Sequence, residues 1–277
     1  MQFGMPTLLE CETLKENVAL CKRLGLKFVE LNMNFPAFQT DRLEDTGRFL
    51  AAAEEAGIYY TLHLDERLDI ADFNPLVAEA YRETVRRTVE TAKALLLLRD
   101  RFGDPSQPLT VTMHMNHGVY ITLPDRRTDL YEKHFGAYMA AFTNFRRLCE
   151  RWIGDADIRL CVENTDGFRP FEWEAIGFLL RKPCFGLTWD VGHSKAVGEK
   201  DVPFLMANRE HILHFHIHDG REAPPANHLA LGDGEIPLED RLNLARERNA
   251  RCVLETKTVA ALEQSVRWLR EHHFMDD

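Results

Sequence analysis

The feature that most constrains the fold of this 277-residue chain is a regular alternation of short β-rich runs with longer amphipathic stretches. Such alternation is typical of repeated βα units, which build a parallel sheet. The β-rich runs are Gln2 to Thr7, Lys27 to Leu31, Ile58 to Leu64, Leu109 to Met115, Ile158 to Glu163, Phe185 to Asp190, Ile212 to His218 and Arg251 to Glu255. Helical patterns between them include Thr13 to Leu24, Arg42 to Ala56, Leu76 to Phe102, Leu130 to Trp152 and Val259 to His272. Eight strands with intervening helices predict an α/β fold, a single (β/α)8 TIM barrel formed by residues 1–277.

The other common architecture with this alternation is a doubly wound open sheet, which usually carries a glycine-rich phosphate turn after its first strand. Here Gly4 is followed by Met5, Pro6 and Thr7, and neither GxGxxG nor GxxxxGK[ST] occurs in the chain. We therefore expect no nucleotide cofactor.

Composition limits the partners. The net charge of −10 disfavours a nucleic-acid partner, because phosphate backbones would be repelled. The longest apolar stretch, Ala94 to Leu98, is far too short to span a bilayer, and the start MQFGMPTLLE lacks the features of a signal peptide. The six cysteines form no CxxC pair, so we expect reduced and mostly buried thiols. These observations predict a cytoplasmic protein with no membrane partner, and they leave a homo-oligomer open.

Potential metal ligands close six consecutive predicted strands, the third to the eighth. They are His63, His114, Glu163, Asp190, His216 and Glu255, and Glu30 similarly follows KFV on the second strand. The chemistry of a TIM barrel lies at the C-terminal ends of its strands. Strand residues alternate between interior and exterior, and the parity of these side chains places all of them on the inward face if their apolar neighbours face the helices. The sequence therefore predicts one convergent site at the barrel mouth.

Three inward carboxylates at one mouth, Glu163, Asp190 and Glu255, would repel one another and lose hydration, which calls for a cation or a strongly raised pKa. A single strand-end histidine is more often a hydrogen-bonded core or rim residue than a ligand. The joint occurrence of six potential ligands of matching parity, both histidines and carboxylates, favours one divalent metal ion instead. Oxygen and imidazole ligands without sulfur suit Mn²⁺, Co²⁺, Zn²⁺ or Mg²⁺ and do not choose among them.

Weaker candidates lie beyond the strand ends. His193 lines the site or caps the next helix, and a turn at Gly232 and Gly234 would fold His228 over the mouth. His214 is expected deeper, as a core histidine. Candidate substrate-binding residues are Glu30, Phe35 with its neighbour Phe38, and the basic residues Arg169, Lys195, Arg221 and Lys257. Ordinary loop packing and solvated surface charge are the alternative interpretations for the aromatic and basic residues.

Five motifs occur in a characteristic order: VENTDG at Val162, WDVGHS at Trp189, HFHIHD at His214, HLALGDGEI at His228 and VLET at Val253. In these motifs the chain resembles the xylose isomerase-like TIM-barrel superfamily, which joins sugar isomerases and epimerases to the endonuclease IV family. The resemblance implies one metal ion at Glu163, Asp190, His216 and Glu255. It also implies that Glu163 and Glu255 form the catalytic acid/base pair, which moves a proton through an enediolate of a small sugar or sugar derivative. His193 would help to position a substrate oxygen.

Endonuclease IV offers the second hypothesis, a zinc phosphodiesterase acting on abasic DNA. Its additional ligands match His63, His114, His193 and His228, which are therefore candidates for a second metal or for substrate binding. The family's aspartate two residues before the loop histidine is Ala226 here, which puts the third zinc in doubt. A non-catalytic sugar-binding barrel is the third hypothesis, but a binder does not need both Glu163 and Glu255.

Overall fold

The computed structural model describes residues 1–276 and contains a closed barrel of parallel strands in the order β1-β12-β9-β8-β7-β4-β3-β2. The barrel strands are β1 (Gln2–Pro6), β2 (Phe28–Asn32), β3 (Tyr59–His63), β4 (Leu109–His114), β7 (Ile158–Glu163), β8 (Phe185–Asp190), β9 (Ile212–Ile217) and β12 (Arg251–Leu254). Each corresponds to one of the eight predicted strands, so the predicted TIM barrel is confirmed.

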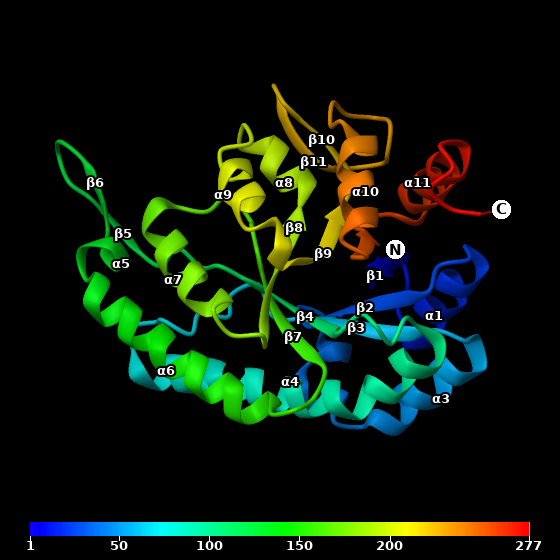
Figure 1. Cartoon of the computed structure of the whole chain (residues 1–277), viewed down its shortest axis with the longest axis horizontal. Coiled ribbons are helices and arrows are strands. Elements are labelled where there is room, and N and C mark those ends of the chain that lie inside the picture. Colours follow the sequence, from blue (N-terminus) through cyan, green and yellow to red (C-terminus); the bar gives the residue numbers. More distant parts are fainter. Residues whose placement is uncertain (277) are drawn as a thin grey trace.

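Helices surround the barrel, and the long α4 and α6 run side by side along one side of it (Figure 1). The α-helices are α1 (Leu14–Arg23), α2 (Thr40–Leu43), α3 (Thr46–Ala56), α4 (Pro75–Phe102), α5 (Leu130–Lys133), α6 (Phe135–Ile153), α7 (Pro170–Leu180), α8 (Val191–Ala196), α9 (Val202–Ala207), α10 (Leu238–Glu247) and α11 (Val259–Glu271). Two short 3-10 turns, Pro36–Phe38 and Arg209–His211, connect neighbouring elements. Within residues 1–276, no helix is long and apolar enough to cross a membrane.

The prediction was wrong for two stretches, each of which was expected to form one helix and is divided into two. The stretch from Arg42 to Ala56 is divided at Asp45, whose φ of −75° and ψ of 67° are not helical. Aspartate favours helix starts over helix interiors, which explains the division. The stretch from Leu130 to Trp152 is divided at His134. The apolar periodicity continues through this division because Tyr131 and Tyr138 pack on the same core, with ring centroids 4.9 Å apart.

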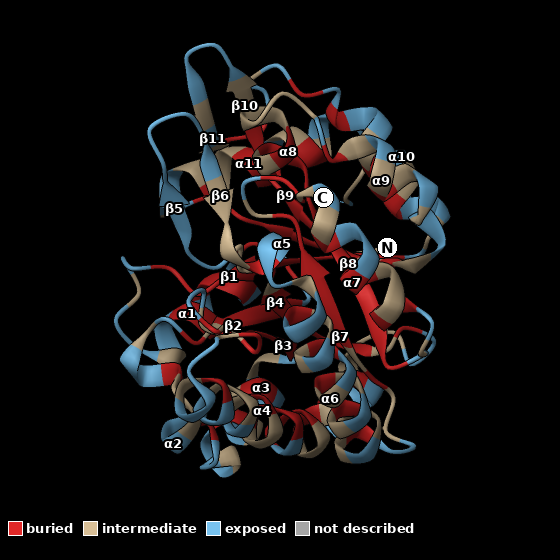
Figure 2. Ribbon diagram, turned by 90° about the vertical axis from the view of Figure 1, so that its left-hand side faces the viewer, coloured by how far each residue is buried: buried red, intermediate tan, exposed pale blue. Residues whose placement is uncertain are grey.

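Burial is concentrated in the barrel strands, whereas the helices expose their outer faces (Figure 2). Inside the barrel, small polar residues pair across the lumen, and Thr112 Oγ1 lies 3.0 Å from Thr188 Oγ1. Near the N-terminal ends of the strands the buried Arg251 donates its Nε–H to the hydroxyl of Tyr59 at 2.9 Å. All six cysteines are free and five of them are buried, as predicted.

Two antiparallel hairpins interrupt the βα pattern and were not predicted. One joins β5 (Tyr120–Thr122) to β6 (Arg127–Asp129) after β4, and the other joins β10 (Asp219–Glu222) to β11 (Pro225–Leu229) after β9. Both project from the body of the molecule (Figure 1). Because they follow the C-terminal ends of barrel strands, they stand at the mouth where the candidate site residues lie.

Candidate metal and active site

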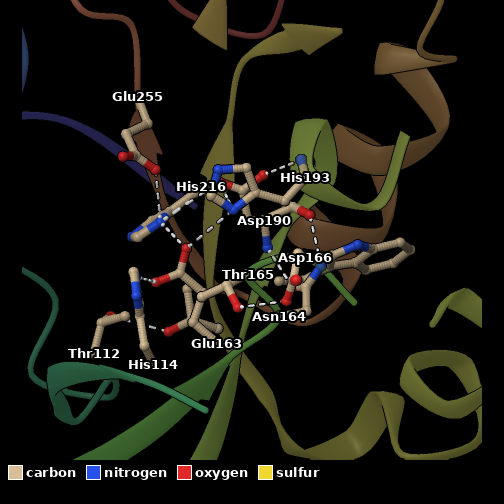
Figure 3. A network of polar contacts seen from close by, with 12 residues as sticks. Thr112, His114, Glu163, Asn164, Thr165, Asp166, Asp190, His193, His216 and Glu255 are labelled. Carbon is tan, nitrogen blue, oxygen red and sulfur yellow. Dashed lines mark hydrogen bonds and ion pairs between the residues drawn. The ribbon is translucent and has the colours of Figure 1, made fainter. Parts of the chain in front are cut away.

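Four candidate ligands come from four strands that are neighbours in the barrel. Glu163 ends β7, Asp190 ends β8, His216 lies in β9 and Glu255 directly follows β12. Each offers one ligand atom, and these four atoms all lie within 4.8 Å of one another. All four side chains are buried, and Figure 3 shows them converging on one point. The structure thus brings together the predicted set.

The imidazole of His216 is at the centre of this group. Its Nδ1 lies 3.0 Å from Oε1 of Glu163, 2.8 Å from Oε2 of Glu255 and 3.8 Å from Oδ2 of Asp190. One nitrogen therefore faces three carboxylates. A proton on this nitrogen supplies positive charge at the position where the carboxylates converge.

The other nitrogen of His216 faces a fourth carboxylate. Its Nε2 lies 2.8 Å from Oε1 of Glu30, which is buried on β2 across the barrel. Oε2 of Glu30 accepts the hydroxyl of Thr61 at 2.9 Å and lies 3.0 Å from Nε2 of His214. His214 is fully buried and its Nδ1 lies 3.1 Å from Thr110 Oγ1, so it is the core histidine that was predicted. Glu30 contacts these two histidines from within the barrel.

The electrostatics of the site follow from this packing. Burial alone would raise the pKa of Glu163 and Glu255, but the neighbouring cationic groups, His216 above all, outweigh it and hold both pKa values well below the usual range. Burial would lower the pKa of His216, yet Glu163, Glu255 and Glu30 raise it well above its ordinary value. The carboxylates are thus kept ionised, which is the form that binds a cation.

His63 and His114 both approach Glu163 from the neighbouring strands. Nε2 of each ring lies 3.2 Å from Oε2 of Glu163. His63 donates its Nδ1–H to the carbonyl of Leu64 at 2.7 Å, which directs Nε2 toward the carboxylate. Burial would lower the pKa of His63, but the contacts with Glu163 raise it to about 9. Both predicted histidines therefore adjoin the cluster through one oxygen of Glu163, and Figure 3 shows His114 beside that carboxylate.

His193, His218 and His228 form a second group of imidazoles beside the carboxylates. Nε2 of His193 lies 3.4 Å from Nε2 of His228. His228 donates its Nδ1–H to the carbonyl of Glu255 at 2.9 Å, and burial lowers its pKa to about 4, so the ring is neutral and its Nε2 lone pair faces His193. The β10–β11 hairpin, and not the turn at Gly232 and Gly234 that follows it, carries His228 to this position.

Asp190 is positioned by residues that the sequence interpretation did not single out. The side chain of Asn164 bridges the backbone of Asp190, accepting its N–H at 2.8 Å and donating to its carbonyl at 2.9 Å. Nδ1 of His218 accepts the backbone N–H of His228 at 2.7 Å, so the ring proton lies on Nε2 and is donated to the Asp190 carboxylate, 2.9 Å away. Asn164 directly follows Glu163 in VENTDG, a motif position that could have indicated its role.

Gly192 makes room for the His218 ring. A Cβ atom at this position would lie 1.9 Å from Cε1 of His218, so no other residue fits without moving the imidazole. The glycine of WDVGHS is therefore required by the packing of a histidine in the next motif of the chain, HFHIHD.

Asp219 anchors the loop that follows β11. Its carboxylate accepts backbone N–H groups from Gly232 at 3.1 Å, Gly234 at 2.8 Å and Ile236 at 3.1 Å. These bonds draw the LGDGEI segment back onto the β10–β11 hairpin. The turn at the two glycines was predicted, whereas its carboxylate anchor was not.

The basic candidates differ in their surroundings. Lys257 Nζ lies 2.9 Å from Oε1 of Glu255, so this lysine adjoins the cluster. Arg221 lies on β10 with its Nε buried and without a hydrogen-bond partner within residues 1–276. Arg169 precedes α7 and pairs with Asp129 at 3.1 Å, and Lys195 lies on α8. Of these four, Lys257 alone contacts a candidate ligand in the described part of the chain.

Phe35 packs edge-on against the buried Phe38, with ring centroids 6.3 Å apart. Phe38 in turn contacts Phe49 of α3, with centroids 6.4 Å apart. The pair is thus part of the packing between the loop after β2 and the surrounding helices, and Phe35 remains half-buried at its edge.

The residues at the convergence point fit a divalent metal ion. Oε2 of Glu255 and Nδ1 of His193 are buried atoms without a hydrogen-bond partner among the described residues. His216 Nδ1 is hydrogen-bonded to Glu163 and leaves Oε2 of Glu255 unsatisfied. His193 Nδ1 lies 3.5 Å from Oδ2 of Asp190, on the border of the same group. Three carboxylates and one imidazole nitrogen form a donor set suited to Mn²⁺, Co²⁺, Zn²⁺ or Mg²⁺.

Comparisons with known proteins agree with this architecture. A family model described as xylose isomerase-like TIM barrel matches residues 18–272. A D-tagatose 3-epimerase-like protein is 18% identical, with a TM-score of 0.76 over 99% of this chain and 97% of that one. The 3-keto-D-glucoside 4-epimerase of E. coli is 16% identical, with a TM-score of 0.73 over 98% and 99% of the two chains. A probable 3-DHS dehydratase of Bacillus anthracis is 15% identical, with a TM-score of 0.65 over 97% and 98%. No curated protein sequence matches the chain.

Proposed function

The chain belongs to the xylose isomerase-like TIM barrel family, and from this premise we propose that it is a divalent-metal-dependent isomerase or epimerase of a small sugar or sugar derivative. The observation that carries the proposal is the group of Glu163, Asp190, His216 and Glu255, whose ligand atoms lie within 4.8 Å of one another. Epimerases among the similar structures add support, although at 12–18% identity they establish the fold alone.

In this proposal Glu163 and Glu255 are the acid/base pair. Their carboxylates approach His216 Nδ1 to 3.0 Å and 2.8 Å, so both border the position of the bound ion. One carboxylate removes the proton from the carbon beside the substrate carbonyl, and the other returns a proton to the reacting unit. Lys257, 2.9 Å from Oε1 of Glu255, keeps that carboxylate ionised and ready to accept a proton.

When bound, a divalent cation would polarise the carbonyl and hydroxyl oxygens of the substrate and stabilise the negative charge that develops on them. Asp190 and His216 hold the cation together with the two glutamates. His63 and His114 contact Oε2 of Glu163 and so fix the orientation of its carboxylate. His193, whose Nδ1 lies 3.5 Å from Oδ2 of Asp190 at the border of the cluster, would hold a substrate oxygen.

Proton exchange in D2O tests this function. The metal-loaded protein is incubated with a panel of ketoses, and NMR detects deuterium at the carbon beside the carbonyl. At least one ketose should exchange, and Glu163→Gln and Glu255→Gln should each slow the exchange by about 10²-fold or more. Glu247→Gln, an exposed carboxylate on α10, is the matched control and should leave the rate unchanged. Exchange that persists in both site variants would contradict the assignment of the pair.

A further inference from the structure

A separate cavity opens at the same mouth of the barrel, on the side of β3, β4 and β7. Its volume is about 490 Å³, and its walls come from the loops after these three strands and from the β5–β6 hairpin. Its lining includes Arg67, His117, Arg127, Asp166 and Arg169. Asp166 lies three residues after Glu163, and Figure 3 shows it near the catalytic cluster. The cavity therefore lies where a substrate held at the cluster could extend.

The hairpin wall of this cavity is fixed by tight packing. Gly118 has a φ of +68°, and a Cβ there would lie 2.3 Å from Cε2 of Tyr131. The backbone N–H of Leu130 donates to the carbonyl of Val119 at 3.0 Å, which ties the hairpin base to α5. On the hairpin itself, the Arg127 guanidinium lies over the Tyr120 ring, 3.1 Å from its centroid. The stacked guanidinium is thereby presented as part of the cavity wall.

Charges around the cavity favour an anion. Within residues 1–276, Arg67 and Arg127 have no carboxylate within 4.0 Å, although the protein carries a net charge of −10. His117 contacts both Asp166 and Glu172 and offsets part of their negative charge, and Asp129 pairs with Arg169 at 3.1 Å. Burial raises the pKa of Asp69 to about 6, so this acid is still mostly ionised at neutral pH, and its carboxylate accepts the hydroxyl of Tyr131 at 2.7 Å. Asp72 is the remaining acid, and its Oδ1 accepts the N–H of Asn74 at 2.7 Å.

We propose that this cavity binds an anionic group, a carboxylate or a phosphate ester, carried by the substrate at the end remote from the reacting carbon. Arg67 and Arg127 are the primary contacts, because the planar guanidinium fork matches both anions in geometry. The statement that the anion belongs to the substrate rests on the proposed function. The binding of an anion in the cavity does not depend on it.

Isothermal titration calorimetry tests the anion site, with inorganic phosphate and acetate added separately to the metal-free protein. The variants are Arg67→Gln, Arg127→Gln and the pair combined. Arg126→Gln is the matched control, because Arg126 adjoins Arg127 in the same hairpin but pairs with Asp125 at 2.8 Å and lies outside the cavity. At least one anion should bind, and the double variant should weaken binding about tenfold or more, with no change in the control.

The relative affinities for phosphate and acetate indicate which anionic group the cavity binds. Tighter binding of phosphate assigns a phosphate ester, and tighter binding of acetate assigns a carboxylate. Absence of binding by both anions, or equal weakening in Arg126→Gln and Arg127→Gln, would overturn the anion site. Proton exchange on neutral ketoses without anion binding would leave the proposed function intact and reject the cavity proposal. Anion binding without exchange on neutral, phosphorylated or acidic sugars would retain the site and reject the function.

Discussion

Oε1 of Glu30 lies 2.8 Å from Nε2 of His216, on the far side of the ring from the nitrogen that faces the three candidate carboxylate ligands. A carboxylate that accepts the distal N–H of a metal-binding histidine fixes the ring orientation and increases the basicity of the ligating nitrogen. Glu30 and His216 are 186 residues apart in sequence, and they meet inside the closed barrel, in which β1 and β12 separate β2 from β9.

Glu30→Gln should therefore weaken metal binding by about 10–100-fold while leaving the four ligands in place. The dissociation constant for Mn²⁺ or Co²⁺, measured by calorimetry on the folded protein, checks this. Glu172→Gln is the matched control, since Glu172 is another buried glutamate beside a histidine, His117, but is not part of the ligand group. Equal metal affinities for Glu30→Gln and the natural protein would contradict the role of Glu30.

Gly192→Ala should destabilise the fold and weaken the contact between His218 and the Asp190 carboxylate. The new Cβ would lie 1.9 Å from His218 Cε1, and displacing this buried ring should reduce the free energy of unfolding by about 2 kcal/mol. Gly177→Ala in helix α7 is the control, because a Cβ there meets no heavy atom within 4 Å. The free energy of unfolding of that variant should rise by about 0.5–1 kcal/mol, because alanine has a higher helix propensity than glycine. Urea unfolding measures both, and an unaltered stability of Gly192→Ala would argue against the packing described.

Asp69 should give the stability of the protein a specific pH dependence. Burial raises its pKa to about 6 in the folded state, despite the Tyr131 hydroxyl that it accepts at 2.7 Å, whereas an unfolded aspartate titrates near pH ~3.9. Between these values the folded state binds more protons, so its contribution to the free energy of unfolding falls as pH rises. The free energy of unfolding of the natural protein relative to Asp69→Asn should fall by about 2 kcal/mol between pH ~4.5 and ~7.

Urea unfolding at the two pH values measures this difference. Asp72→Asn removes a neighbouring acid whose charge adds to the raised pKa of Asp69, so this variant should keep most of the fall in the free energy of unfolding. Parallel curves for Asp69→Asn and the natural protein would show that Asp69 has the same proton affinity in the folded and unfolded states.

The parity of strand residues was enough to predict which acids and histidines converge. Glu163 and Asp190 end their strands, and the alternation of side chains along β7 and β8 requires them to face inward. The sequence could not predict that Nδ1 of His216 faces the carboxylates while Nε2 faces Glu30, since this choice depends on contacts across the closed barrel. The role of His218 escaped prediction for the same reason, because the β10–β11 hairpin sets its tautomer through the backbone of His228.

The two hairpins show a different limit. Strands β5 and β6 contain three residues each, too few for alternation to be distinguished from a loop. Their position is fixed by packing, such as that of Gly118 against Tyr131. The cavity that the β5–β6 hairpin lines could therefore not be predicted from the sequence, whereas the site at the strand ends could.

The most direct test of the central claim is the metal content of the purified protein, measured by elemental analysis after loading with Mn²⁺, Co²⁺, Zn²⁺ or Mg²⁺ and repeated on Asp190→Asn. The account predicts about one tightly bound divalent ion per chain, which is lost in the variant. Close to three zinc ions per chain would instead favour a phosphodiesterase site that includes His193 and His228. No bound ion under any loading condition would contradict the metal site formed by Glu163, Asp190, His216 and Glu255.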